Sequence, residues 1–147
     1  MKRLLAVLLC CLLLCGVVPT VSAAGEPNRD VTLNVYNWGE YISDGSEDSL
    51  DVNAAFEEYY YETYGVKVEV NYSTYSSNES MYAKLSSGSV HYDVVVPSDY
   101  MIERMIAEDM LAELNFDNIP HASNLHPDFF GPDAVYDYYD PDNKYAI

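Results

Sequence analysis

Three segments of the chain have the hydrophobic patterning of strands. Residues 31–37 (VTLNVYN) alternate between apolar and polar positions and are rich in β-formers, and residues 66–72 form a second β-rich segment. Residues 92–96 (YDVVV) are a short apolar run typical of a buried parallel strand. The pattern therefore predicts three strands.

Helical segments follow each predicted strand. Residues 50–64 are predicted to be a helix that ends at Gly65. Residues 76–86 are predicted to be a second helix, because Ser76 and Glu79 have the spacing of a capping box. One face of the first helix is predicted to carry Leu50, Ala54, Phe56 and Tyr60.

A third helix is predicted at residues 99–108. Pro97 ends the third strand, and Ser98 is a suitable N-cap. Met101, Met105 and Ile106 are expected to face inward. Residues from His121 onward are dominated by proline and acidic residues, and we expect loops and short helical turns there.

The alternating order of strands and helices predicts an α/β fold with a parallel sheet and helices on both faces. In such sheets ligands bind beyond the carboxyl ends of the strands. Residues 38–41 (WGEY) follow the first strand, and residues 97–100 (PSDY) follow the third. Both clusters combine aromatic and acidic side chains, which makes them the candidate site.

The first 23 residues have the composition of a secretory signal peptide. Lys2 and Arg3 precede an apolar run from Leu4 to Val18, and residues 21–23 (VSA) resemble a cleavage site. A membrane anchor is the alternative, but the run is shorter than the roughly 20 residues that a spanning helix needs. We therefore expect residues 1–23 to be a signal peptide and 24–147 to be part of a solute-binding domain.

All three cysteines lie in the predicted signal peptide. Cleavage after Ala23 would leave a chain without disulfides or cysteine metal ligands. Cys15 is an alternative lipid attachment site, although Leu14 stands where lipoprotein signals have a small residue. The chain is therefore expected to be exported, either free in the periplasm or at the outer face of the cytoplasmic membrane.

The chain is strongly acidic. It carries 24 Asp and Glu against seven Lys and Arg, and loss of Lys2 and Arg3 would leave five basic residues and a net charge of −19. Such a field attracts cations and disfavours nucleic acid, which needs clustered basic residues. Solubility alone also explains an acidic surface, so charge permits a cationic ligand without demonstrating one.

The two clusters at the predicted strand ends suit a linear polyamine. Aromatic rings such as Trp38 would contact its methylene groups and ammonium groups, and Glu40 would accept hydrogen bonds from one ammonium. The residues leave two alternatives open. Trp38 is equally suited to the core, with Glu40 as a solvated loop residue, and aromatic-plus-acid sites also bind sugars.

Four segments in order resemble the spermidine/putrescine-binding proteins of polyamine ABC transporters. They read YNWGEYI, NYSTYSSNESMYAKL, YDVVVPSDYMIERM and DPDNKYAI, and the resemblance covers about Leu33 to Ile147. It implies a type II periplasmic-binding-protein-like lobe, with the ligand in a cleft between two lobes. It also implies a non-enzymatic role in delivering spermidine or putrescine to ABC permease subunits, without a cofactor, as a monomer.

By this resemblance, the ligand-binding residues are Trp38, Glu40, Tyr41, Ser98 and Tyr100. Two positions depart from the family pattern. Gly39 stands where the family often has Thr, so a hydroxyl contact is expected to be lost. Asp99 replaces a common Thr or Ser, and either a ligand contact or helix capping explains it. Family members are about twice as long, the second lobe is missing here, and the chain alone is expected to bind weakly or not at all.

Other functions receive less support from the residues. His91, His121 and His126 have no metal-ligand spacing, and the acidic residues from Asp137 to Asp142 lack the glycine and closing Glu of a calcium loop. Glu40 and Asp99 are the best pair for a glycosidase, but no nucleophile motif accompanies them. A same-fold binding protein for a sugar, an iron chelate or thiamine is the remaining alternative.

Overall fold

A computed structural model describes residues 30–131, 134, 138–140 and 142–147. The predicted signal peptide and Asp137 lie outside these residues. Within the described part, none of the helices has the length and apolar character needed to cross a membrane. The elements are β1 (Val31–Trp38), η1 (Ser46–Asp48), α2 (Val52–Tyr64), β2 (Val68–Tyr75), α3 (Asn78–Ser86), β3 (Val94–Val95), α4 (Asp99–Ala107), η2 (Phe116–Asn118) and η3 (Pro120–Asn124).

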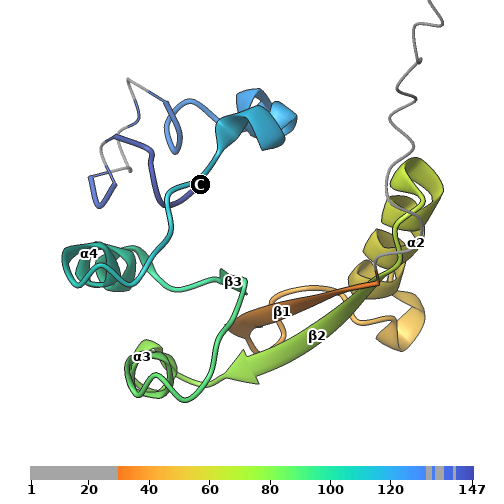
Figure 1. The fold of residues 1–147 in the computed structure, drawn as a ribbon, viewed down its shortest axis with the longest axis horizontal. Coiled ribbons are helices and arrows are strands. Elements are labelled where there is room, and N and C mark those ends of the chain that lie inside the picture. Colours follow the sequence, from red (N-terminus) through yellow and green to blue (C-terminus); the bar gives the residue numbers. More distant parts are fainter. Residues whose placement is uncertain (1–29, 132–133, 135–137, 141) are drawn as a thin grey trace, which may run out of the picture.

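The three described strands form one parallel sheet in the order β2-β1-β3 (Figure 1). β1 and β2 pair along their full length, from Val31 opposite Val68 to Trp38 opposite Tyr75. In Figure 1, α2 lies toward the amino ends of these strands, whereas α3 and α4 lie toward their carboxyl ends. The parallel sheet with connecting helices is the predicted arrangement.

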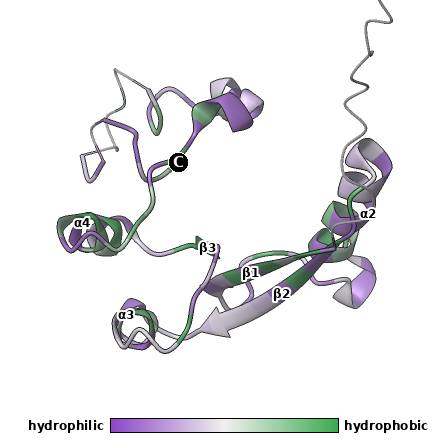
Figure 2. Ribbon diagram, in the orientation of Figure 1, coloured by the Kyte–Doolittle hydropathy of each residue, from purple (hydrophilic) through white to green (hydrophobic). Residues whose placement is uncertain are grey.

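Two strands differ in extent from the prediction. β2 begins at Val68 and continues to Tyr75, three residues past the predicted end. Its carboxyl half appears pale in Figure 2, because the tyrosine, serine and threonine side chains there are neither strongly hydrophobic nor strongly hydrophilic. β3 is only Val94–Val95. On either side of it, the backbone N–H groups of Asp93 and Val96 each donate one hydrogen bond to a backbone carbonyl of β1.

Helix α2 covers the sheet less than its pattern predicts. The Asp51 side chain caps its first turn, Gly65 ends it in the left-handed conformation, and none of its residues is buried. Leu50, predicted to belong to the apolar face of the helix, lies before the helix and is 64% exposed. The Glu57 carboxylate accepts a hydrogen bond from the backbone N–H of Val70. It thereby satisfies one backbone donor of β2, which lies at the edge of the sheet.

The starts of α3 and α4 correct two further predictions. Ser77, not Ser76, caps α3, because its hydroxyl accepts a hydrogen bond from the N–H of Ser80. Ser98 occupies the N-cap position of α4, as predicted, but its hydroxyl makes no capping hydrogen bond. Met101 and Met105 of α4 are buried, as predicted.

The most deeply buried side chains gather near the carboxyl ends of the strands. Tyr36, Tyr75, Met81, Met101 and Met105 form one cluster, which α3 and α4 complete. Long, flexible methionine side chains fill irregular gaps in a core and make favourable contacts with aromatic rings. This cluster therefore fixes the two helices against the strand ends, where the candidate site lies.

Candidate functional site

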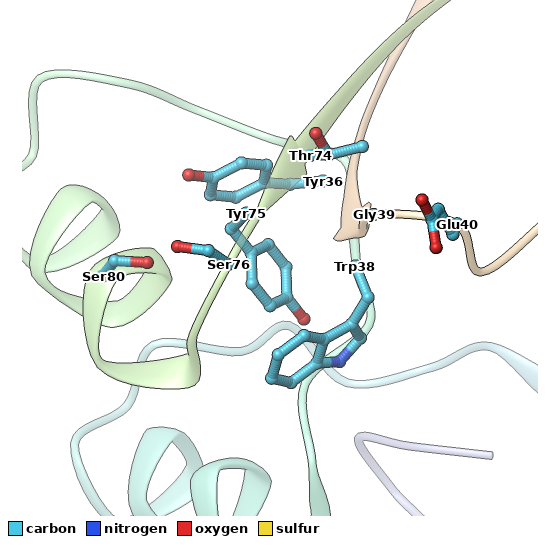
Figure 3. A pocket seen from close by; sticks show the side chains of 8 residues that line it. All are labelled: Tyr36, Trp38, Gly39, Glu40, Thr74, Tyr75, Ser76 and Ser80. Carbon is cyan, nitrogen blue, oxygen red and sulfur yellow. The ribbon is translucent and has the colours of Figure 1, made fainter.

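An open pocket of about 650 Å³ lies at the carboxyl ends of β1 and β2 (Figure 3). This is the edge of the sheet where the strand pattern places a ligand. Three aromatic rings, one carboxylate and three serine or threonine hydroxyl groups line it, together with the phenolic hydroxyls of two of the rings. The lining residues are Tyr36, Trp38, Gly39, Glu40, Thr74, Tyr75, Ser76 and Ser80.

Trp38 and Tyr75 form one wall of the pocket. They are paired in the register of β1 and β2, and their ring centroids are 4.8 Å apart (Figure 3). The Tyr75 hydroxyl donates a hydrogen bond to the carbonyl oxygen of Val96, just after β3. Burial is the main cause that raises the pKa of Tyr75 to about 12, so this hydroxyl remains a hydrogen-bond donor at neutral pH.

Tyr36, which lines the pocket, also contacts a cationic side chain of the protein, that of Lys84. Its ring stacks on that of Tyr92, with centroids 4.4 Å apart and an interplanar angle of 8°. The Lys84 ammonium lies 4.7 Å from the Tyr36 ring centroid and donates a 2.8 Å hydrogen bond to the Tyr92 hydroxyl. The Tyr36 ring therefore already contacts an ammonium group, that of Lys84, which is not part of the pocket lining.

Glu40 provides the only carboxylate among the lining residues. It sits in the turn after β1 with φ of 59°, in the left-handed region that residues other than glycine seldom adopt. In Figure 3 its carboxylate lies on the opposite side of Gly39 from the Trp38 and Tyr75 rings. The exposed side chain can therefore meet a charged group at the mouth of the pocket while the rings contact an apolar chain.

The structure divides the predicted site residues into two groups. Trp38 and Glu40 line the pocket, whereas Tyr41, Ser98 and Tyr100 are outside its lining. Tyr41 is 63% exposed and Tyr100 is 49% exposed. Ser98 and Tyr100 begin α4, and both are hydrogen-bonded to the Asn78 side chain at the start of α3.

Sequence reasoning missed the wall that β2 and α3 contribute. Thr74, Tyr75, Ser76 and Ser80 line the pocket, but the predicted strand ended at residue 72. Two signals point to them. Parallel pairing brings the end of β2 to the same edge as the end of β1, and residues 73–77 (STYSS) supply the aromatic and hydroxyl groups.

Asp99 has protein partners for both of its carboxylate oxygens. One accepts a 2.7 Å hydrogen bond from the backbone N–H of Tyr100, and the other accepts one from the Tyr138 hydroxyl. These hydrogen bonds, that from Tyr138 first, hold the pKa of Asp99 below its ordinary value. The carboxylate therefore acts within the protein at the start of α4, which favours the helix-terminus interpretation.

The described residues contain no group of three His, Cys, Asp or Glu side chains arranged to hold a metal ion. Of the two predicted glycosidase carboxylates, Glu40 alone lines the pocket. The arrangement suits binding: rings for apolar contact, hydroxyl groups for hydrogen bonds, and one carboxylate for a cation.

Comparison with known proteins identifies relatives over most of the chain. It is 36% identical over 137 residues to the spermidine/putrescine-binding periplasmic protein of Escherichia coli, covering 92% of this chain and 34% of that protein. It is 35% identical over 135 residues to the putrescine-binding periplasmic protein PotF of E. coli, covering 92% and 32%. No family model matches. The chain thus spans about a third of the length of these curated relatives.

Solved structures show the same similarity. The spermidine/putrescine ABC transporter substrate-binding protein PotD of Streptococcus pneumoniae matches with a TM-score of 0.59 and 34% identity, over 79% of this chain and 31% of that one. The TpPotD lipoprotein of Treponema pallidum matches with a TM-score of 0.56 and 29% identity, over 78% and 31%. The predicted solute-binding-protein fold is confirmed. Along nearly its whole length, this chain is a homologue of the spermidine/putrescine-binding periplasmic proteins, as its sequence motifs indicate.

Proposed function

We propose that this chain forms part of a non-enzymatic binding protein that captures spermidine or putrescine outside the cytoplasm and delivers it to an ABC permease. The observation that carries the proposal is the open pocket at the strand ends, which is lined by the Trp38 and Tyr75 rings, by hydroxyl groups and by Glu40. The relatives named for binding spermidine and putrescine support the same ligand class.

The chemistry of the pocket matches the two parts of a polyamine. The methylene chain would lie against the Trp38 and Tyr75 rings, which removes apolar surface from water. An ammonium group over an aromatic face gains roughly 0.5–2 kcal/mol. Glu40 would accept a charge-assisted hydrogen bond from a second ammonium, and Ser76 or Ser80 would accept further N–H groups.

Charge also supports a cationic ligand. The sequence has a net charge of −17, and the pocket lining includes Glu40 but no Lys or Arg. Such a field raises the local concentration of cations and speeds their encounter with the site. A neutral sugar gains nothing from this field, so the field favours the polyamine over the sugar alternative.

The same relatives support export and delivery. Two of them are named as periplasmic proteins and one structure is described as a lipoprotein, which supports an exported protein with or without a lipid anchor. We propose that residues 1–23 direct export, with Cys15 as the candidate for tethering. Closure of a two-lobed protein around its ligand would then be the signal that the permease reads.

Calorimetric titration tests this function. The protein made from its complete gene, without residues 1–23, is titrated with spermidine, putrescine and a neutral sugar at two salt concentrations. We expect one-to-one binding of a polyamine that weakens with salt, and no heat from the sugar. A folded protein that binds the sugar and ignores both polyamines would overturn the proposal.

A further inference from the structure

Asn78 is buried, with 3% of its surface exposed, and it stands at the first position of α3. It faces the start of α4, twenty residues further along the chain. Its side-chain oxygen accepts a 3.2 Å hydrogen bond from the backbone N–H of Ser98. Its side-chain nitrogen donates a 2.8 Å hydrogen bond to the Tyr100 hydroxyl.

The hydrogen-bond donors and acceptors around Asn78 allow only one orientation of its side-chain amide. The Ser98 N–H can only donate, so the amide oxygen must face it and the amide NH₂ must face Tyr100. The Tyr100 hydroxyl then accepts from Asn78, and its own proton points to the Glu79 carboxylate, 3.1 Å away. A single amide therefore sets both the position of Ser98 and the direction of the Tyr100 proton.

We infer that Asn78 is a positioning residue for ligand binding, because it holds Ser98 and Tyr100 at the strand-end edge where α3 also supplies Ser80 to the pocket. This inference rests on the proposed function, since Ser98 and Tyr100 lie outside the pocket lining and are candidate ligand contacts through the family resemblance. Without the amide, the partly buried N–H of Ser98 loses its acceptor and the Tyr100 hydroxyl keeps only its hydrogen bond to Glu79. The ligand would then have to order these groups itself, which weakens binding.

A double-mutant cycle tests this role. Spermidine affinity is measured by calorimetry for the protein from its complete gene and for Asn78→Ala, Tyr100→Phe and the double variant. We expect Asn78→Ala alone to weaken binding about tenfold. In the Tyr100→Phe background the same change should cost only about two- to threefold, because its effect through the Tyr100 hydroxyl is already lost.

Two further variants separate positioning from folding. Asn71→Ala removes another amide, one that bonds to Asn34 in the middle of the sheet, and should leave spermidine affinity unchanged. Where the Asn78→Ala variant unfolds, the double-mutant cycle is repeated with Asn78→Ser, which leaves a smaller void. Thermal melting is recorded for every variant, so that a loss of stability is measured apart from the coupling.

The outcomes distinguish the two proposals. Suppose that the parent protein binds spermidine and that Asn78→Ala lowers spermidine affinity equally with and without Tyr100→Phe. Asn78 then does not act through Tyr100 and this inference is wrong, while the proposed function stands. Unchanged affinity in both Asn78 variants would overturn the inference in the same way. If the parent protein binds no polyamine, the proposed function fails and the inference falls with it.

Discussion

Trp38 and Tyr75 end adjacent parallel strands in register, and their rings meet with centroids 4.8 Å apart. They are 37 positions apart in the sequence, yet the pairing of β1 with β2 makes them one aromatic wall. Tyr75 also donates a hydrogen bond to the carbonyl of Val96, so the ends of all three strands are connected at this point. The aromatic wall of the candidate site is therefore built on the sheet itself, whereas Glu40 lies in the turn after β1.

Removing the Trp38 ring should weaken polyamine binding. We expect Trp38→Ala to lower spermidine affinity about tenfold or more, through lost cation–π and apolar contact, and Trp38→Phe to lower it less. Calorimetry measures both. Phe56→Ala on α2 removes an exposed ring toward the other end of the sheet and should leave the affinity unchanged. Equal binding by the parent and Trp38→Ala would place the ligand elsewhere.

Trp38 is also a convenient probe, since it is the chain's single tryptophan. Its side chain is half-buried at the pocket. We expect its fluorescence to respond to solvent quenchers and to change when spermidine binds. Emission that is blue-shifted, resistant to quenchers and unaffected by spermidine would instead assign Trp38 to the core.

Glu40 should contribute through its charge. We expect Glu40→Gln to lower spermidine affinity about three- to tenfold and to reduce the salt dependence of binding, because an exposed ion pair is screened by salt. The matched control is Glu58→Gln, which removes an exposed carboxylate on α2 and changes the net charge equally. If both variants lose affinity equally, the overall charge rather than Glu40 attracts the ligand.

The order of the elements was predictable from the sequence, whereas the shape of the pocket was not. Strand and helix patterns place Trp38 and Glu40 after the predicted strand at residues 31–37, and Met101 and Met105 in the core. They do not reveal Tyr75, because residues 71–77 (NYSTYSS) contain no aliphatic position to mark a strand. The link from Asn78 to Ser98 also escapes pattern analysis, since it depends on how α3 and α4 meet in space.

Lys84 should control the titration of Tyr92. The Lys84 ammonium, hydrogen-bonded to the Tyr92 hydroxyl, stabilises the phenolate and so holds the pKa of Tyr92 below its ordinary value. We therefore expect Lys84→Met to raise this pKa toward 10. NMR of labelled tyrosine rings during an alkaline titration measures it. Lys67→Met, which removes a cation before the amino end of β2, is the control and should not move it.

The cap of α3 gives a test of local structure that separates two adjacent serines. The sequence pattern favours Ser76, but in the structure the Ser77 hydroxyl accepts the hydrogen bond from the N–H of Ser80. Loss of an N-cap hydroxyl exposes an unsatisfied donor and costs about 1 kcal/mol. We expect Ser77→Ala to lower the free energy of unfolding by about this amount.

Ser76→Ala is the matched control for the cap, because it deletes the same atom one residue earlier. Its side chain is exposed at the pocket, so we expect a change below about 0.5 kcal/mol. Urea unfolding of the three proteins measures the difference. Since α3 carries Asn78 and Ser80, a weaker cap would also loosen the pocket wall. A larger loss in Ser76→Ala than in Ser77→Ala would restore the pattern-based assignment.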